Sequence, residues 1–234
     1  MAARQASASV CDRCRVANDA TERAVLVGQI PMSAPTQATL QGPNGDFCPV
    51  EAAISEKSCK FVADMKEVKI KDAALRAAAA EGMDAFIKVF VDGIRSAVGG
   101  QLTAEAMGEL NSDQLTLLAY DALHEEVMDG GFVQLIHNGY GGFIFRNPFA
   151  KAVKQWGLRD LAKLVYNAGA LYARHHEEIE RDCSDEEFMA LFERFPEFDD
   201  LDDEFVENEE EWTAAVAHYV DENIGRFATI EANE

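Results

Sequence analysis

The sequence lacks any apolar run long enough to cross a membrane. A helix needs about 20 consecutive apolar residues to span a bilayer, and no segment of the 234 residues approaches that length. The first thirty residues also lack the basic start and the long apolar stretch of a signal peptide. With 48% hydrophobic residues, the chain suffices for one good-sized core. We therefore expect a soluble, cytoplasmic protein that has no membrane partner.

Signatures of the common enzyme classes are absent or incomplete. Gly139-x-Gly141 lacks the third glycine of a dinucleotide fingerprint, and there is no Gly-Lys-Ser/Thr phosphate loop and no Gly-x-Ser-x-Gly elbow. The segments His124–Met128 and His176–Glu180 begin like a zinc-protease helix, but each lacks the second histidine four residues on. The acidic segment Asp199–Glu211 lacks the glycine that an EF-hand loop needs at its sixth position. We therefore expect no catalytic residues.

Cysteines are few, and their spacing does not complete a metal site. Cys11-x-x-Cys14 has the spacing of half a zinc site. Cys48 and Cys59 are separated by ten residues and supply no second pair of ligands, while Cys183 stands alone. Free thiols are the expected state, and the sequence predicts no metal and no other cofactor.

Positive charge is scarce in one part of the chain. The net charge is −21, and residues 177–211 hold two basic and eighteen acidic residues, a net charge of −16. Residues 1–64 and residues 65–176 each carry −1, and residues 212–234 carry −3. A salt-adapted protein would spread its acids over every exposed face, so this localisation indicates one specific negative surface.

Residues 1–64 differ from the rest of the chain in composition. They contain four of the six prolines and four of the five cysteines, with much Ser, Thr, Gln and Ala and no sustained periodicity. We expect this extension to be mostly disordered. A regular sequence begins at Met65, which suggests that Met65 is the biological start and that the preceding segment has no role in folding.

Helical periodicity dominates residues 65–230 and predicts an all-α protein with a single compact multi-helix domain. Glycine pairs, prolines and capping residues divide the pattern into separate helices. The predicted helices cover residues 72–81, 83–98, 111–128, 132–137, 147–157, 158–182, 184–196 and 209–227. A short strand at residues 143–145 is the one exception to this pattern.

A cluster of glycine and polar residues follows the helix predicted over 111–128. It comprises Glu126, Gly130, Gly131, Phe132, Gln134, Asn138 and Gly141. In one interpretation these residues are structural: the glycines end one helix, Phe132 anchors the next, and Gln134 and Asn138 hydrogen-bond the backbone at the turn. In the other interpretation the Gly130–Gly141 region is a polar site for a small ligand or an enzymatic reaction, with His137 as its acid or base.

The same run of residues, Glu126 to Gly141, resembles a bacterial family of helical domains that is named for a DNA mimic protein. The Gly-Gly-Phe-x-Gln-x-x-x-Asn core carries this resemblance, which extends over residues 110–228 and includes the segment around Trp212. The resemblance implies an all-helical protein that can form a homodimer. It also implies a negative surface that occupies the DNA-binding face of a basic partner, such as a helix-turn-helix transcription regulator, and no direct binding to nucleic acid.

The acidic segment supplies the candidate partner-binding surface. Duplex DNA carries one negative charge per about 3.4 Å along one strand, and a wholly helical 177–211 segment would carry one per about 3.3 Å. The candidate residues are Glu177, Glu178, Asp185, Glu186, Asp199, Asp200, Asp202, Asp203, Glu204, Glu207, Glu209, Glu210 and Glu211. Four aromatic residues alternate with the acids, and we interpret them as anchors that hold the segment on the core. They are Phe195, Phe198, Phe205 and Trp212.

Three functions remain open on the sequence. A DNA mimic would block the DNA binding of a basic partner, and duplex DNA would compete with it for that partner. An acidic protein–protein adaptor would bind another basic partner, and DNA would not affect the binding. An enzyme or small-ligand protein would use the Gly130–Gly141 region, and its function would depend on His137 rather than on the acidic segment.

Overall fold

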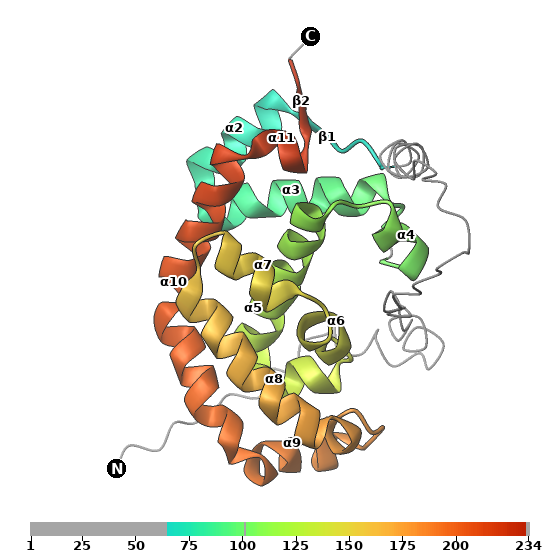
Figure 1. Ribbon diagram of the computed structural model, residues 1–234, viewed down its shortest axis with the longest axis vertical. Helices are drawn as coiled ribbons and strands as arrows, with labels where there is room; N and C mark the ends of the chain where they lie inside the picture. The colour runs from blue at the N-terminus through green and yellow to red at the C-terminus, as the bar shows by residue number, and fades with distance from the viewer. Residues whose placement is uncertain (1–64, 101, 233–234) are drawn as a thin grey trace, which may run out of the picture.

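The structure is a computed structural model that describes residues 65–100 and 102–232 (Figure 1). Its elements are, in chain order, β1 (Lys69–Lys71), α2 (Asp72–Glu81), α3 (Met83–Ala97), α4 (Ala104–Gly108), α5 (Ser112–His137), α6 (Gly141–Phe145), α7 (Phe149–Gln155), α8 (Arg159–Ile179), α9 (Asp185–Arg194), the 3₁₀ turn η1 (Pro196–Phe198), α10 (Asp199–Glu222), α11 (Ile224–Phe227) and β2 (Thr229–Glu231). Within the described residues, no helix combines the length and the apolar character that crossing a bilayer requires.

Helix α5 is the centre of the fold, and α3, α6, α7, α8 and α10 all contact it (Figure 1). It begins with a capping box, in which the Asn111 side chain accepts from the Gln114 amide and the Gln114 side chain accepts from the Asn111 amide. Leu117, Leu118 and Leu123 are completely buried although they point in different directions around the helix. Burial on all sides is expected of a helix that other helices surround.

The glycine pair Gly130–Gly131 bends α5 near its C-terminal end. Both residues depart from helical geometry, and Gly131 has a φ of 75°, in the left-handed region that favours glycine. The bend redirects the last part of the helix so that Phe132, Leu135 and Ile136 are completely buried. The helix break predicted at this glycine pair is therefore confirmed.

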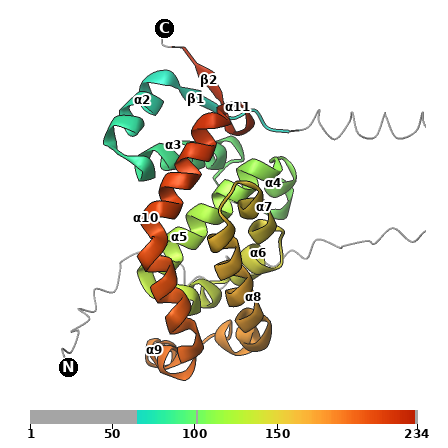
Figure 2. The same ribbon diagram turned by 60° about the vertical axis from the view of Figure 1, so that its left-hand side comes forward.

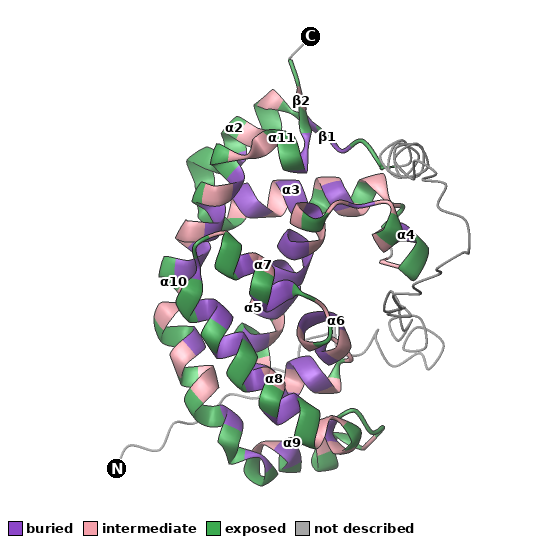
Figure 3. Cartoon of the chain, in the orientation of Figure 1, coloured by how far each residue is buried: buried purple, intermediate pink, exposed green. Residues whose placement is uncertain are grey.

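Helix α10 runs along the length of the molecule and packs against α3, α5 and α8 (Figures 1 and 2). Its buried and exposed residues alternate with the helical period, as the colouring in Figure 3 shows. Phe205, Val216 and Val220 are completely buried, and only 6% of Trp212 is exposed. Helix α10 therefore has an apolar inner face on the core and a separate outer face.

Strands β1 and β2 form a parallel pair that joins the two ends of the described chain, with Ile70 opposite Ile230. The Thr229 amide donates to the carbonyl of Val68 at 2.8 Å. A two-stranded ladder is marginally stable by itself, but Val68 and Ile70 are also buried in the core. The pair thus fastens the C-terminal end of the domain to its N-terminal end.

The prediction of an all-α fold with a single compact multi-helix domain is confirmed, but the structure differs in three places, apart from the short helix α4, which was not predicted. Residues 143–145 are helical and not a strand, because amide hydrogen bonds from Ile144 to Tyr140 and from Arg146 to Gly142 close the helical turn. Strands β1 and β2 were missed, because three residues are too few to show alternation. The prediction that residues 1–64 are mostly disordered concerns a segment outside the residues that the structure describes.

The third difference concerns the start of α10. The sequence predicts a helix from residue 209 after an acidic connection, whereas the helix begins at Asp199. Acidic side chains are favourable in the first turn of a helix because they interact with the exposed amide groups and the helix dipole. Asp199, Asp200 and Asp202 occupy that turn. The most acidic part of the chain is therefore regular helix.

We predict that Phe205→Ala lowers the free energy of unfolding by about 3–5 kcal/mol, because the ring is completely buried and its removal leaves a cavity. Urea unfolding followed by circular dichroism would measure the change. The neighbouring Val206 is 54% exposed, so Val206→Ala is the matched control and should change stability by less than about 0.5 kcal/mol. Similar costs for both variants would contradict the inward packing of α10.

Candidate partner-binding surface

Residues 199–211, the N-terminal half of α10, carry seven acidic residues on the outer side of the helix, which we call the outer acidic face. Successive helical residues turn by about 100°, so residues at i, i+4, i+7 and i+11 form one stripe. One such stripe is Asp200, Glu204, Glu207 and Glu211, and a second is Asp199, Asp203 and Glu210, with Val206 between the last two. All seven are exposed except Glu204, which is half-buried. Both stripes fall on the side of α10 opposite to the core.

The outer acidic face has no compensating cations among the residues that the structure describes. Helix α10 contains neither Lys nor Arg. Across residues 65–100 and 102–232, none of its seven carboxylates has an ion-pair partner within 4.0 Å. The negative potential of this face is therefore directed into solvent.

The density of these charges is comparable to that of DNA. Thirteen residues from Asp199 to Glu211 span about 18 Å at about 1.5 Å per residue. The seven carboxylates thus provide one charge per about 2.6 Å of axis, between the values of about 1.7 Å for both strands of a duplex and about 3.4 Å for one strand. The chain turns between α8, α9 and α10, as the separate helices predicted over residues 158–227 imply, so a charge density along one straight axis applies to α10 alone.

Repulsion within the outer acidic face is smaller than the stabilisation from the inner face. Seven pairs of its residues are three or four positions apart, and each such like-charge pair costs about 0.2–0.5 kcal/mol, so the total is about 1.5–3.5 kcal/mol. Burial of one large apolar side chain contributes about 1.5–3 kcal/mol. Phe198, Phe205 and Trp212 are all buried under α10, so the helix is held against this repulsion.

The interpretation of the four aromatic residues as anchors is confirmed by their burial. Phe195 and Trp212 are 4% and 6% exposed, and Phe198 and Phe205 are completely buried. Phe205 packs edge-on against Phe132 of α5, with the ring centroids 6.5 Å apart, and against Trp212 at 5.5 Å. These contacts fix the rotation of α10 and so determine which acids face outward.

Asp202 was predicted to belong to the partner-binding surface, but its side chain lies on the inner side of α10. Its carboxylate accepts a hydrogen bond from the Phe132 amide at 2.8 Å, at the point where α5 resumes after the glycine bend. A side chain on Gly131 would collide with this carboxylate. Burial raises the pKa of Asp202 to about 7, the Phe132 amide opposes the shift, and Asp199 and Asp203 add to it. We therefore leave Asp202 out of the proposed contact surface.

Glu209 also lies on the inner side of α10. Its carboxylate is 2.7 Å from Nε2 of His124 on α5, and it accepts a hydrogen bond from the Thr213 hydroxyl at 2.9 Å. The Thr213 hydroxyl is in turn 2.8 Å from the Tyr120 hydroxyl. Glu209 is thus engaged with α5 and does not contribute to the outer acidic face.

The remaining candidates lie on α8 and α9, at the end of the molecule where α10 begins (Figures 1 and 2). Glu177, Asp185 and Glu186 are exposed. Glu178 is ion-paired with Arg194, so its charge is compensated. Asp185 and Glu186 lie in the first turn of α9, between Ser184 and Glu187, which form the capping box of this helix. Three of these four residues can extend the negative surface beyond α10.

The family-motif residues form a network inside and beside the bend of α5. The side-chain amides of Gln134 and Asn138 both donate to the carboxylate of Glu126, at 3.3 and 2.7 Å. The expected hydrogen bonds from these amides to the backbone are replaced by this shared acceptor, which ties the two halves of the bent helix together. Burial raises the pKa of Glu126, and the two amides oppose the shift.

Two glycines of the motif lie directly against side chains of the scaffold. A Cβ atom on Gly130 would collide with the Gln134 side chain, and a Cβ atom on Gly141 would collide with the Tyr172 ring. Phe132, between them in sequence, is completely buried. These contacts contribute to the packing of α5 and α6 in the core.

His137 is held by the scaffold. Its Nδ1 lies 2.8 Å from the carbonyl oxygen of Ile179, at the end of α8, and its ring packs on Phe188 with the centroids 4.6 Å apart. A cavity of about 320 Å³ lies elsewhere, between α3, α5 and α10, and neither Gln134, His137 nor Asn138 lines it. The histidine therefore contributes to the packing between α5, α8 and α9.

That cavity was not anticipated from the sequence. Asp84, Tyr120, His124 and Thr213 are among the residues that line it, and Glu209 contacts His124 beside it. They come from three helices that are far apart in the chain: Asp84 from α3, Tyr120 and His124 from α5, and Glu209 and Thr213 from α10. The sequence offered only the incomplete zinc-protease pattern at His124, in which the expected partner was a second histidine on the same helix.

Two comparisons relate the chain to known proteins. The model of the DMP19-like protein family matches residues 108–223. The chain is also 37% identical over 127 residues to the protein named DNA mimic protein DMP19 from Neisseria meningitidis serogroup B, and the alignment covers 54% of this chain and 77% of that relative. The resemblance inferred from the glycine motif is therefore confirmed, over a range close to the predicted 110–228.

We predict that Asp202 makes stability depend on pH. Its carboxyl keeps its proton up to about pH 7 in the folded state, but loses it near the ordinary value of 3.8 when unfolded. The folded state is therefore favoured by this group at low pH, and the contribution is lost as pH rises through about 4 to 7. Asp202→Asn, which carries no charge at any pH, should abolish this loss.

Urea unfolding at about pH 5 and about pH 8 would test the prediction. Between these values the wild type should lose about 1–2 kcal/mol more than Asp202→Asn, less than the full linkage value because the side chain is partly solvated. Asp200→Asn removes an exposed charge from the same helix turn and should keep the wild-type dependence. Equal pH dependence in the wild type and Asp202→Asn would contradict the buried, protonated carboxyl.

Proposed function

This chain belongs to the DMP19-like protein family, and we propose that it acts as a DNA mimic. The outer acidic face of α10 binds the DNA-binding surface of a basic protein and so prevents that protein from binding DNA. A helix-turn-helix transcription regulator is one partner class with a suitable surface. The single observation that carries the proposal is the array of seven uncompensated carboxylates on one rigid helix face.

The electrostatics of α10 support this function. A protein surface that binds DNA carries Lys and Arg side chains placed to neutralise a dense row of phosphates. The outer acidic face offers such side chains a comparable row of charges, and long-range attraction accelerates the encounter of opposite fields. Binding should therefore be fast and should weaken with salt.

The rigidity of α10 supports it as well. Ordering a flexible acidic segment at the moment of binding would cost conformational entropy. Helix α10 is already ordered, because its inner face is buried and because Asp202 and Glu209 bind to α5. The carboxylates thus need little rearrangement to meet a partner.

The same surface suits a DNA-binding protein better than DNA itself. Net repulsion opposes any approach of the phosphate backbone to a face that has no Lys or Arg. We therefore propose no direct binding to nucleic acid and no enzymatic activity. The homodimer implied by the family resemblance stays a prediction.

We predict that neutralising one stripe abolishes partner capture. In the stripe variant, Asp200→Asn, Glu204→Gln, Glu207→Gln and Glu211→Gln are combined, and four charges are lost from the outer acidic face. Pull-down from the source cells at low salt should recover DNA-binding proteins with the wild type and lose at least about 90% of them with the variant. Duplex DNA added to the wild-type pull-down should release the same proteins.

The control variant loses four charges elsewhere. Glu81→Gln, Asp92→Asn, Glu105→Gln and Asp160→Asn are combined at exposed positions on α2, α3, α4 and α8, and capture should persist. Equal losses in the two variants would show a general effect of net charge and would refute a specific surface. Partners that the stripe variant loses but DNA does not displace would indicate an acidic adaptor instead.

We predict that His137→Ala leaves partner capture unchanged within about twofold. The substitution removes the hydrogen bond to the Ile179 carbonyl and the packing on Phe188, so it should lower the free energy of unfolding by about 1–3 kcal/mol. Pull-down and urea unfolding on the same preparation would separate the two effects. Loss of capture by a folded His137→Ala protein would favour a function centred on the Gly130–Gly141 region.

A further inference from the structure

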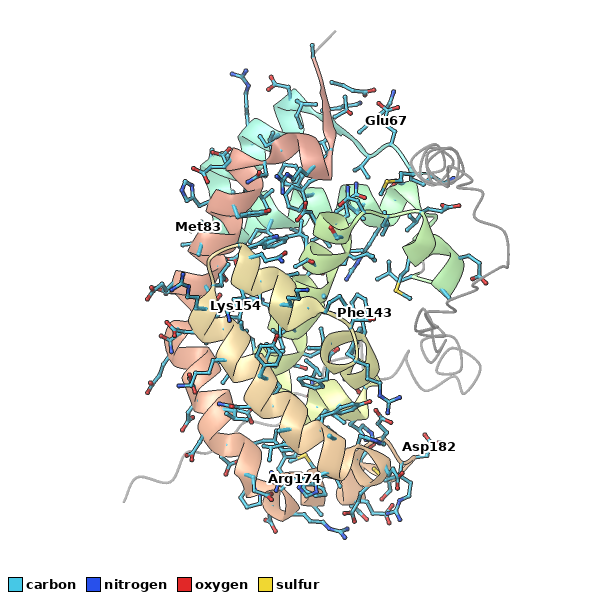
Figure 4. The ribbon with its side chains drawn as sticks, viewed as in Figure 1. Glu67, Met83, Phe143, Lys154, Arg174 and Asp182 are labelled. Atoms are coloured by element: carbon cyan, nitrogen blue, oxygen red, sulfur yellow. The ribbon has the colours of Figure 1, made fainter. Side chains whose placement is uncertain are left out.

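Three potential metal ligands from three different helices meet beside the cavity between α3, α5 and α10. They are Asp84 in the first turn of α3, His124 in α5 and Glu209 in α10, and one ligand atom of each lies within 4.8 Å of the others. Figure 4 labels Met83, the residue before Asp84, beside the ribbon of α10. Asp84 lies outside the range 108–223 that the family model matches, so this arrangement is not a feature of the matched region alone.

The distances among the ligand atoms suit a small divalent cation. A tetrahedral cation holds nitrogen and oxygen ligands at about 2.1 Å, which places any two of them about 3.4 Å apart. His124 Nε2 and Glu209 Oε1 are 2.7 Å apart, so they need to separate by less than one ångström. Asp84 is exposed at the protein surface, and its ligand atom lies within 4.8 Å of the other two.

The surroundings resemble the supporting shell of a metal site. Carboxylate ligands are commonly oriented by a second hydrogen bond, and the Thr213 hydroxyl donates such a bond to Glu209 at 2.9 Å. Thr213 is itself fixed by Tyr120 at 2.8 Å, and both residues are buried. The position of Glu209 is therefore set in advance of any ligand.

The local charge also favours a cation. Lys88 lines the cavity, but its ammonium group is bound by Glu125 at 3.0 Å and by Asp121 at 3.5 Å. Asp84 and Glu209 together with a neutral His124 would carry a charge of about −2, which one divalent cation balances. The cavity of about 320 Å³ leaves space for water to complete the coordination.

We propose that Asp84, His124 and Glu209 bind one divalent transition-metal cation of the zinc class. One imidazole and two carboxylates are a donor set that such cations accept. The bound cation joins α3, α5 and α10 and thereby fixes α10, whose opposite side carries the outer acidic face. The proposal does not depend on the identity of any partner protein.

Zinc titration of the full chain by isothermal calorimetry, with its thiols blocked by alkylation, would test the site. We expect one equivalent to bind to the wild type, and the melting temperature to rise with zinc concentration because the cation binds the folded state. Asp84→Asn should weaken binding at least about tenfold. This variant leaves the hydrogen bonds among His124, Glu209 and Thr213 in place. If those three residues had a purely structural role, Asp84→Asn would therefore not change the affinity for zinc.

Two further variants complete the test. His124→Gln should abolish the binding of one equivalent of zinc. Circular dichroism would show whether this variant keeps its helical structure. If it does not, Asp84→Asn decides the test. Asp92→Asn removes an exposed carboxylate from the same helix as Asp84 and should bind zinc like the wild type. Absence of a saturable equivalent in the wild type, or equal affinity in Asp84→Asn, would overturn the proposal.

Discussion

The rest of the structure depends on one balance, between repulsion on the outside of α10 and burial on its inside. Seven like charges lie on one helix face, and none of them has an ion-pair partner within the described part of the chain. Because Phe198, Phe205, Trp212 and Val216 are buried beneath them, the gain from apolar burial exceeds the cost of the charges by a factor of about two or more. An acidic segment without this inner face would remain an extended, self-repelling chain.

Two acidic residues in the N-terminal half of α10 serve the opposite purpose to the seven of the outer acidic face. Asp202 and Glu209 turn inward, where they bind the Phe132 amide and the His124 ring of α5. These contacts require the glycine bend, because Gly131 makes room for Asp202. The family motif and the acidic helix are therefore physically linked: the bend that the motif creates is one of the places where α10 is attached.

This linkage connects the two parts of the protein that serve different purposes, the helical scaffold and the surface charge. The network of Glu126, Gln134 and Asn138 holds the bend in place, while the seven carboxylates of the outer acidic face lie on the side of α10 that faces away from the core. A DNA mimic requires that its exposed charges are regularly spaced and rigidly held. The scaffold supplies both, and a cation bound between α3, α5 and α10 would add to the rigidity from the inner side.

The sequence by itself determined the helical class, the helix starts at Asn111 and Ser184, the break at Gly130–Gly131 and the localisation of the negative charge. These features are local, since period, caps and glycine conformations depend on residues a few positions apart. Only the tertiary structure decided where α10 begins, that β1 pairs with β2, and which acids point outward. Those outcomes depend on packing between segments distant in the chain: the outward direction of Asp203 and the inward direction of Asp202 follow from the burial of Phe205 against Phe132, a contact that no local pattern encodes.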